Sequence, residues 1–178
     1  PIYWKQEPHE SILELYKQRA QQLREQYDYI VLFWSGGADS ETVLQSFIYN
    51  DIKLDEIVSY SNYEASNDKT DNMNSELFFR TIPRAEKLKN QYPWMKFRIL
   101  DLSEMTLDYF ISQQNKFDWI FGANMMLTPN VIARDGLGYK IDEWRKIIDS
   151  GKKLCLLWGA DKPRLFHENG KFLMRFPR

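Results

Sequence analysis

Short apolar runs alternate along this chain with segments whose apolar residues recur at helical spacing. Uninterrupted runs of about four to eight apolar residues suit buried strands, whereas recurrence at every third or fourth position suits a helix packed on one face. Residues 29–34 form such a run, and the mostly apolar segments 56–60, 97–101, 117–121 and 153–158 are interpreted as further strands. Helical spacing marks residues 11–26, 40–50, 72–92, 103–115 and 140–150. This alternation predicts βαβ units, and therefore an α/β fold with five strands in a mainly parallel sheet and helices on both faces.

The ends of the chain add two smaller features to this predicted body. Residues 1–27 form an N-terminal helical extension, and residues 163–178 predict a β-hairpin that closes at Asn169-Gly170, because Asn-Gly suits the left-handed positions of a tight turn. A chain of 178 residues has the length of a single domain with its own core. It ends directly after a predicted strand, which suggests the N-terminal part of a longer protein.

Charge and cysteine content limit the partners and the cellular compartment that the sequence predicts. The net charge is −1 and the pI is about 6.2, so no overall basic field draws the protein to nucleic acid or to an anionic membrane, although a tRNA acceptor stays open. No apolar run reaches the length of a membrane span. The single cysteine, Cys155, predicts a reducing, cytoplasmic location. It falls within a predicted strand, where we expect a buried and unreactive thiol.

Polar residues and glycines gather where the predicted strands end. In sheets of this kind, ligands bind at the carboxyl ends of the strands. Five exits therefore matter, at residues 35–37, 61–62, 101, 122–124 and 159–162, and three of them combine glycine with polar groups.

The first exit, Ser-Gly-Gly-Ala-Asp-Ser at residues 35–40, carries the clearest chemistry. Two glycines between a strand and a helix let the backbone approach a ligand closely, and successive amides at a helix start favour an anion. Ser35 and Ser40 would add hydroxyl donors to phosphate. Asp39 would sit beside phosphate only with a cation between them, which makes it a candidate Mg²⁺ ligand. The alternative is a tight turn in which a serine or Asp39 caps the helix.

The hexapeptide resembles the Ser-Gly-Gly-x-Asp-Ser signature of the PP-loop, or N-type, ATP pyrophosphatases. The resemblance implies a parallel sheet of strand order 3-2-1-4-5 that binds ATP and Mg²⁺ and cleaves the α–β bond of ATP. It also implies an adenylated acceptor and pyrophosphate as products. Residue by residue, it implies that Ser35, Gly36, Gly37, Ala38, Asp39 and Ser40 hold pyrophosphate, with Asp39 the catalytic Mg²⁺ ligand, and that Ser59, Tyr60 and Ser61 lie against adenine.

The fifth exit, Trp-Gly-Ala-Asp-Lys-Pro at residues 158–163, looks like a segment found in phage-type members of the same superfamily. We expect Asp161 and Lys162 to bind the nucleotide, and Lys162 to act in catalysis by offsetting charge on the leaving pyrophosphate. A solvated lysine, or one paired with Asp161, is the alternative.

The remaining candidates are less specific. Gly122 would approach the nucleotide, and Asn124 and Arg134 would contact the acceptor. Asn124 is equally suited to a turn, and Arg134 to a pair with its neighbour Asp135. Arg80 and Arg84 lie one helical turn apart, which favours a solvated face.

Together with these residues, the resemblance implies an ATP-dependent adenylating ligase. Amide or amidine formation fits better than sulfur transfer, because no exposed reactive cysteine is expected. The chain carries no N-terminal cysteine nucleophile, so ammonia would come from solution or from a partner. Two alternatives stay open: a nucleotide-binding module without turnover, acting as sensor or interaction partner, and a simple nucleotide hydrolase.

Overall fold

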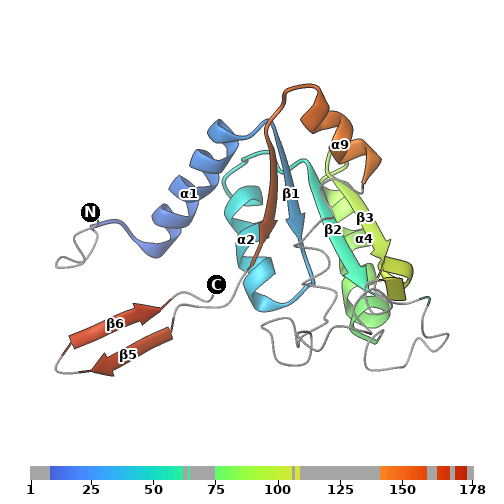
Figure 1. The fold of residues 1–178 in the computed structure, drawn as a ribbon. Helices are drawn as coiled ribbons and strands as arrows, with labels where there is room; N and C mark the ends of the chain where they lie inside the picture. Colours follow the sequence, from blue (N-terminus) through green and yellow to red (C-terminus); the bar gives the residue numbers. More distant parts are fainter. Residues whose placement is uncertain are drawn as a thin grey trace.

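The fold is that of a computed structural model of the chain (Figure 1). The structure describes residues 9–61, 64, 75–105, 107–108, 141–159, 164–168 and 171–175. Its helices are α1 (Ile12–Gln26), α2 (Ala38–Ile48), α4 (Ile82–Gln91) and α9 (Asp142–Asp149), with a π-helical turn, η2 (Leu77–Thr81), directly before α4. Its strands are β1 (Tyr29–Phe33), β2 (Glu56–Ser61), β3 (Lys96–Asp101), β4 (Leu154–Trp158), β5 (Arg164–Glu168) and β6 (Lys171–Arg175).

Four strands form one parallel sheet in the order β3-β2-β1-β4. The strands predicted at 29–34, 56–60, 97–101 and 153–158 are therefore confirmed, and so is the α/β class with a parallel sheet. The chain runs from β1 outward to β2 and β3 on one side, whereas β4 lies on the other side of β1. The direction of strand order thus reverses between β1 and β4, and the loop after β1 leaves the sheet at this point.

The expected order 3-2-1-4-5 needs one correction. It placed the predicted strand at 117–121 next to the first strand and the strand at 153–158 outside it. Instead, β1 pairs directly with β4, from Tyr29 opposite Leu154 to Phe33 opposite Trp158, and pairs with β2 along its other edge. Because a strand has only two edges, no position beside β1 is left. Residues 117–121 themselves lie outside the described residues.

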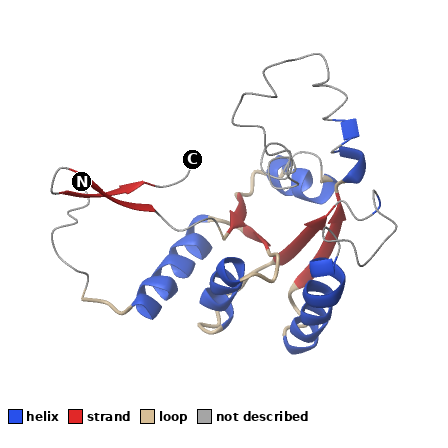
Figure 2. Cartoon of the chain, turned by 90° about the horizontal axis from the view of Figure 1, so that it is seen from below, coloured by secondary structure: helices blue, strands red, loops and turns tan. Residues whose placement is uncertain are grey.

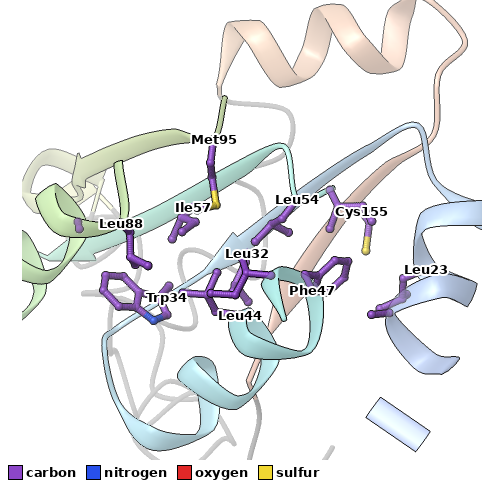
Figure 3. Packing of buried hydrophobic residues seen from close by; sticks show 14 residues of the cluster. Leu23, Leu32, Trp34, Leu44, Phe47, Leu54, Ile57, Leu88, Met95 and Cys155 are labelled. Carbon is purple, nitrogen blue, oxygen red and sulfur yellow. The ribbon is translucent and has the colours of Figure 1, made fainter. Parts of the chain in front are cut away.

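Helices cover both faces of this sheet, as the strand alternation predicted (Figure 2). Ile30, Leu32 and Trp34 point to the face that packs against α1, α2 and α4. Val31 and Phe33 point to the opposite face and pack against Trp144 of α9. Figure 3 shows the larger cluster, in which side chains from the sheet pack against side chains from the helices on this face. The labelled residues are Leu23, Leu32, Trp34, Leu44, Phe47, Leu54, Ile57, Leu88, Met95 and Cys155.

Local sequence explains where the helices begin and bend. Ser11 caps α1 with a reciprocal capping box: its hydroxyl accepts the Glu14 amide at 3.3 Å, and its own amide donates to the Glu14 carboxylate at 2.7 Å. Pro83 lies in the first turn of α4, directly after η2. Because proline lacks an N–H and crowds the carbonyl four residues earlier, the regular helix is interrupted at this point.

The C-terminal strands are a separate two-stranded sheet. β5 and β6 pair antiparallel, with Arg164 opposite Arg175 and Glu168 opposite Lys171. Residues 169–170 between them lie outside the described part. No helix among the described residues is long and apolar enough to cross a membrane.

Candidate functional site

The loop after β1 turns through its two glycines into α2. Gly36 has a φ of +78°, a left-handed conformation that side chains rarely adopt. Gly37 is the N-cap of α2, and no side chain caps this helix. The alternative in which a serine or Asp39 caps α2 is therefore wrong. Asp39 lies instead in the first turn of the helix and is exposed. The backbone amides at the start of α2 thus lie next to a loop of small residues at the carboxyl end of β1.

Two serine hydroxyls hold the loop in shape. Ser40 donates from Oγ to the Gly37 carbonyl at 3.2 Å and accepts the Ser35 amide at 3.3 Å. Ser35 Oγ accepts the Gly37 amide at 3.2 Å and lies 3.3 Å from Ser40 Oγ. Ser40 is buried, whereas Ser35 is exposed. Both hydroxyls therefore bond within the loop, and Ser35 is the more exposed of the two residues.

The end of β4 packs directly against this loop through Gly159. A Cβ added at Gly159 would lie 2.6 Å from the Ser40 nitrogen and 2.7 Å from the Asp39 carbonyl carbon. Only a residue without a side chain allows this approach, because the obstructing atoms belong to the backbone of α2. Asp161 and Lys162 follow Gly159 closely in sequence but lie outside the described residues, as do Gly122, Asn124 and Arg134.

The end of β2 extends past the paired part of β1. The last opposed pair is Phe33 with Val58, so Ser59, Tyr60 and Ser61 continue beyond it. Ser59 is buried and donates its hydroxyl to the Trp34 carbonyl at 2.6 Å, so this side chain holds β1 to β2. Burial raises the pKa of Tyr60 to about 12, so its phenol stays neutral at physiological pH.

A cleft of about 500 Å³ opens between the loop and the helix that follows β2. The sequence interpretation missed it, because Arg80 and Arg84 suggested only a solvated face. Both are exposed, but they line this cleft opposite the glycine loop. The spacing of Arg80, Arg84 and Lys87, by four and then three residues, was the available signal. The lining residues are Gly36, Ala38, Glu41, Phe79, Arg80, Pro83, Arg84 and Lys87.

One wall of the cleft is fixed to the loop by charge and hydrogen bonds. Arg84 contacts both carboxylate oxygens of Glu41, which also accepts the Trp34 indole N–H at 3.0 Å. Burial raises the pKa of Glu41, but the hydrogen bonds from Arg84, Gln45 and Trp34 outweigh it and leave the pKa below its ordinary value. Thr81 donates its hydroxyl to the Ser35 carbonyl at 2.9 Å. The loop, α2 and α4 are thereby joined beside the cleft.

The only cysteine has no part in this site. Cys155 lies in β4, is buried, and packs in the core, as the sequence predicted. Burial raises the pKa of its thiol above the ordinary value, which disfavours the reactive thiolate. No protein-family model, curated protein or solved structure matches the chain.

Proposed function

We propose that this chain binds ATP and transfers its adenylyl group to an acceptor. In the proposed reaction, a nucleophilic atom of the acceptor attacks the α-phosphorus and the bond to the bridging α–β oxygen breaks, so pyrophosphate leaves. The observation that carries the proposal is the left-handed Gly36 and the uncapped start of α2, set where strand order reverses between β1 and β4. A loop in that position is where α/β sheets of this type bind ligands.

The loop offers the donors that a pyrophosphate group needs. Amides at the start of α2 point along a helix whose dipole favours negative charge, and the N-cap Gly37 has no side chain to cap them. The exposed Ser35 hydroxyl would add a further donor. Ser40, in contrast, would act by keeping the loop closed, because its hydroxyl already bonds to the Gly37 carbonyl.

Asp39 fits the proposed role of a Mg²⁺ ligand. It is exposed in the first turn of α2, next to where the phosphates would lie. No group of three or more metal-binding side chains occurs among the described residues. Mg²⁺ commonly takes one carboxylate and completes its shell with phosphate oxygens and water, so a single aspartate suffices. When bound, the ion would neutralise charge on the leaving pyrophosphate.

Two further contacts belong to the proposal. The part of β2 that extends past β1, at Ser59, Tyr60 and Ser61, would lie against adenine, with the Ser59 hydroxyl already committed to Trp34. Lys162, three residues after the close contact at Gly159, would offset charge on pyrophosphate. Gly122 and Asp161 would also contact the nucleotide, and Asn124 and Arg134 the acceptor. If the acceptor is a carboxylate, attack of ammonia on its adenylated form would give an amide and release AMP.

The test uses ATP labelled at the α-phosphate, incubated with Mg²⁺ and the purified chain, alone and with carboxylate or amide acceptors. In the presence of an acceptor, we expect labelled AMP or an adenylated acceptor, together with pyrophosphate. Asp39→Asn should abolish this product, because the Mg²⁺ ligand is lost, whereas Thr42→Ala, one turn further along α2, should leave it unchanged. Labelled ADP would contradict the proposal. AMP formed without an acceptor would favour a hydrolase, and binding without turnover would favour a nucleotide-binding module.

A further inference from the structure

The cleft beside the loop carries more positively charged side chains than are neutralised by ion pairs with described residues. Arg84 is balanced by Glu41. Arg80 meets Glu76 only at 3.8 Å, and both side chains are more than half exposed, an arrangement that contributes little. Lys87 makes no ion pair with another described residue. Two cations, Arg80 and Lys87, are therefore left for a ligand.

The walls of the cleft are already organised for such a ligand. Arg84 is fixed by Glu41, and Thr81 fastens the same helical segment to the loop. The volume of about 500 Å³ suits a small molecule or one end of a larger one. Phe79 lines the cleft with an exposed ring. A ligand would thus meet a fixed helical face carrying arginine and lysine, with little rearrangement before binding.

We propose that this cleft binds a phosphate group next to the loop, held by Arg80 and Lys87. A phosphate monoester near neutral pH carries close to two negative charges, which matches Lys87 and the weakly paired Arg80, and the planar fork of arginine suits phosphate oxygens. Gly36 and Ala38 line the cleft and also belong to the loop, so the group would lie beside the proposed ATP phosphates. The inference therefore deepens the proposed function and rests on it where ATP is concerned.

Two sources could supply this phosphate. One is the terminal phosphate of ATP itself, and the other is a second substrate that carries its own phosphate. The probes are an ATP analogue with a methylene group between the α- and β-phosphates, which cannot be cleaved there, and inorganic phosphate. Calorimetric titrations separate the two sources. The free protein is titrated with the analogue and with inorganic phosphate, and the analogue-saturated protein is titrated with inorganic phosphate.

The variant is Arg80→Gln with Lys87→Gln, matched by Lys89→Gln with Arg145→Gln, which removes the same charge from exposed positions outside the cleft. We expect the cleft variant to lose about tenfold or more in affinity for one probe, since two charge-assisted contacts disappear. The matched variant should change by less than about twofold. Circular dichroism checks that both fold.

The probe affected identifies the source. Loss confined to the analogue assigns the cleft to the terminal phosphates of ATP. If the cleft variant loses affinity only for inorganic phosphate, measured on analogue-saturated protein, the cleft is assigned to a second, phosphate-bearing substrate. Equal affinities in the cleft variant, the matched variant and the wild type would overturn the inference. If the wild type fails to bind the analogue, the proposed function fails, whereas phosphate binding that only the cleft variant loses would still support the cleft.

Discussion

A single hydrogen atom at Gly159 determines how closely β4 approaches the candidate site. The ideal Cβ of any other residue would overlap the backbone of α2 at Asp39 and Ser40, which cannot rotate away as a flexible side chain can. Either the end of β4 or the start of α2 must then move. The same α2 turn carries the proposed phosphate amides, so packing and ligand binding depend on one contact.

We therefore expect Gly159→Ala to destabilise the fold by about 1–3 kcal/mol, the usual cost of overpacking a filled site. Affinity for ATP with Mg²⁺ should fall as well, because the displaced turn carries the amides. Urea denaturation and calorimetry measure the two effects. Gly151→Ala is the control: Gly151 has a φ of +79° but no atom within 4 Å of an added Cβ, so it tests backbone strain without a clash. Unchanged stability and affinity in Gly159→Ala would contradict the close contact.

At the scale of elements, α9 is joined to the sheet through one buried polar contact. Trp144 is fully buried and donates its indole N–H to Glu56 at 2.9 Å. Glu56 is also fully buried, and it further accepts from Arg98 and Tyr29. A buried carboxylate is tolerated only with such donors around it. The helix on this face thus depends on a polar network as well as on apolar packing.

Trp144→Phe should separate these two contributions. Phenylalanine keeps most of the apolar contact with Phe33 but removes a donor from Glu56, so we expect a loss of about 1–3 kcal/mol in the free energy of unfolding. Lys146→Ala, on the exposed side of the same helix, should change it by no more than about 0.5 kcal/mol. Chemical denaturation followed by circular dichroism measures both. Equal effects would mean that the hydrogen bond to Glu56 adds no stability.

For the molecule as a whole, the periodicity of the sequence predicted where the strands lie better than which strands pair. Mostly apolar segments identified the four described strands of the main sheet, most clearly β1, which is buried from Ile30 to Phe33. The neighbour of β1 was misplaced, because edge pairing depends on contacts between segments far apart in sequence, and chain order does not encode them. The cleft was missed for a related reason. The spacing of Arg80 and Arg84 defines a helical face, but only tertiary packing sets that face opposite Gly36.

Acid stability tests a contact that connects distant parts of the chain. Asp55 is buried and accepts from Arg24 of α1 at 2.6 Å and from the Ile30 amide of β1 at 2.9 Å, with Lys53 close by. Burial raises the pKa of Asp55, but these donors outweigh it and hold the pKa below its ordinary value. The folded pKa is thus lower than the unfolded one. The resulting stability is present above about pH 4 and is lost as the pH falls through the folded pKa.

Asp55→Asn should therefore lower the free energy of unfolding at neutral pH by about 1–3 kcal/mol, since Arg24 and the buried Ile30 amide lose their charged acceptor. As the pH falls through the folded pKa of Asp55, the wild type loses the same carboxylate, so the two stability curves should converge. Glu86→Gln, which removes an exposed carboxylate of α4, should follow the wild-type curve throughout. Urea denaturation at a series of pH values gives these curves. A constant gap between wild type and Asp55→Asn down to low pH would show that the ionised state of Asp55 does not stabilise the contact between α1 and the sheet.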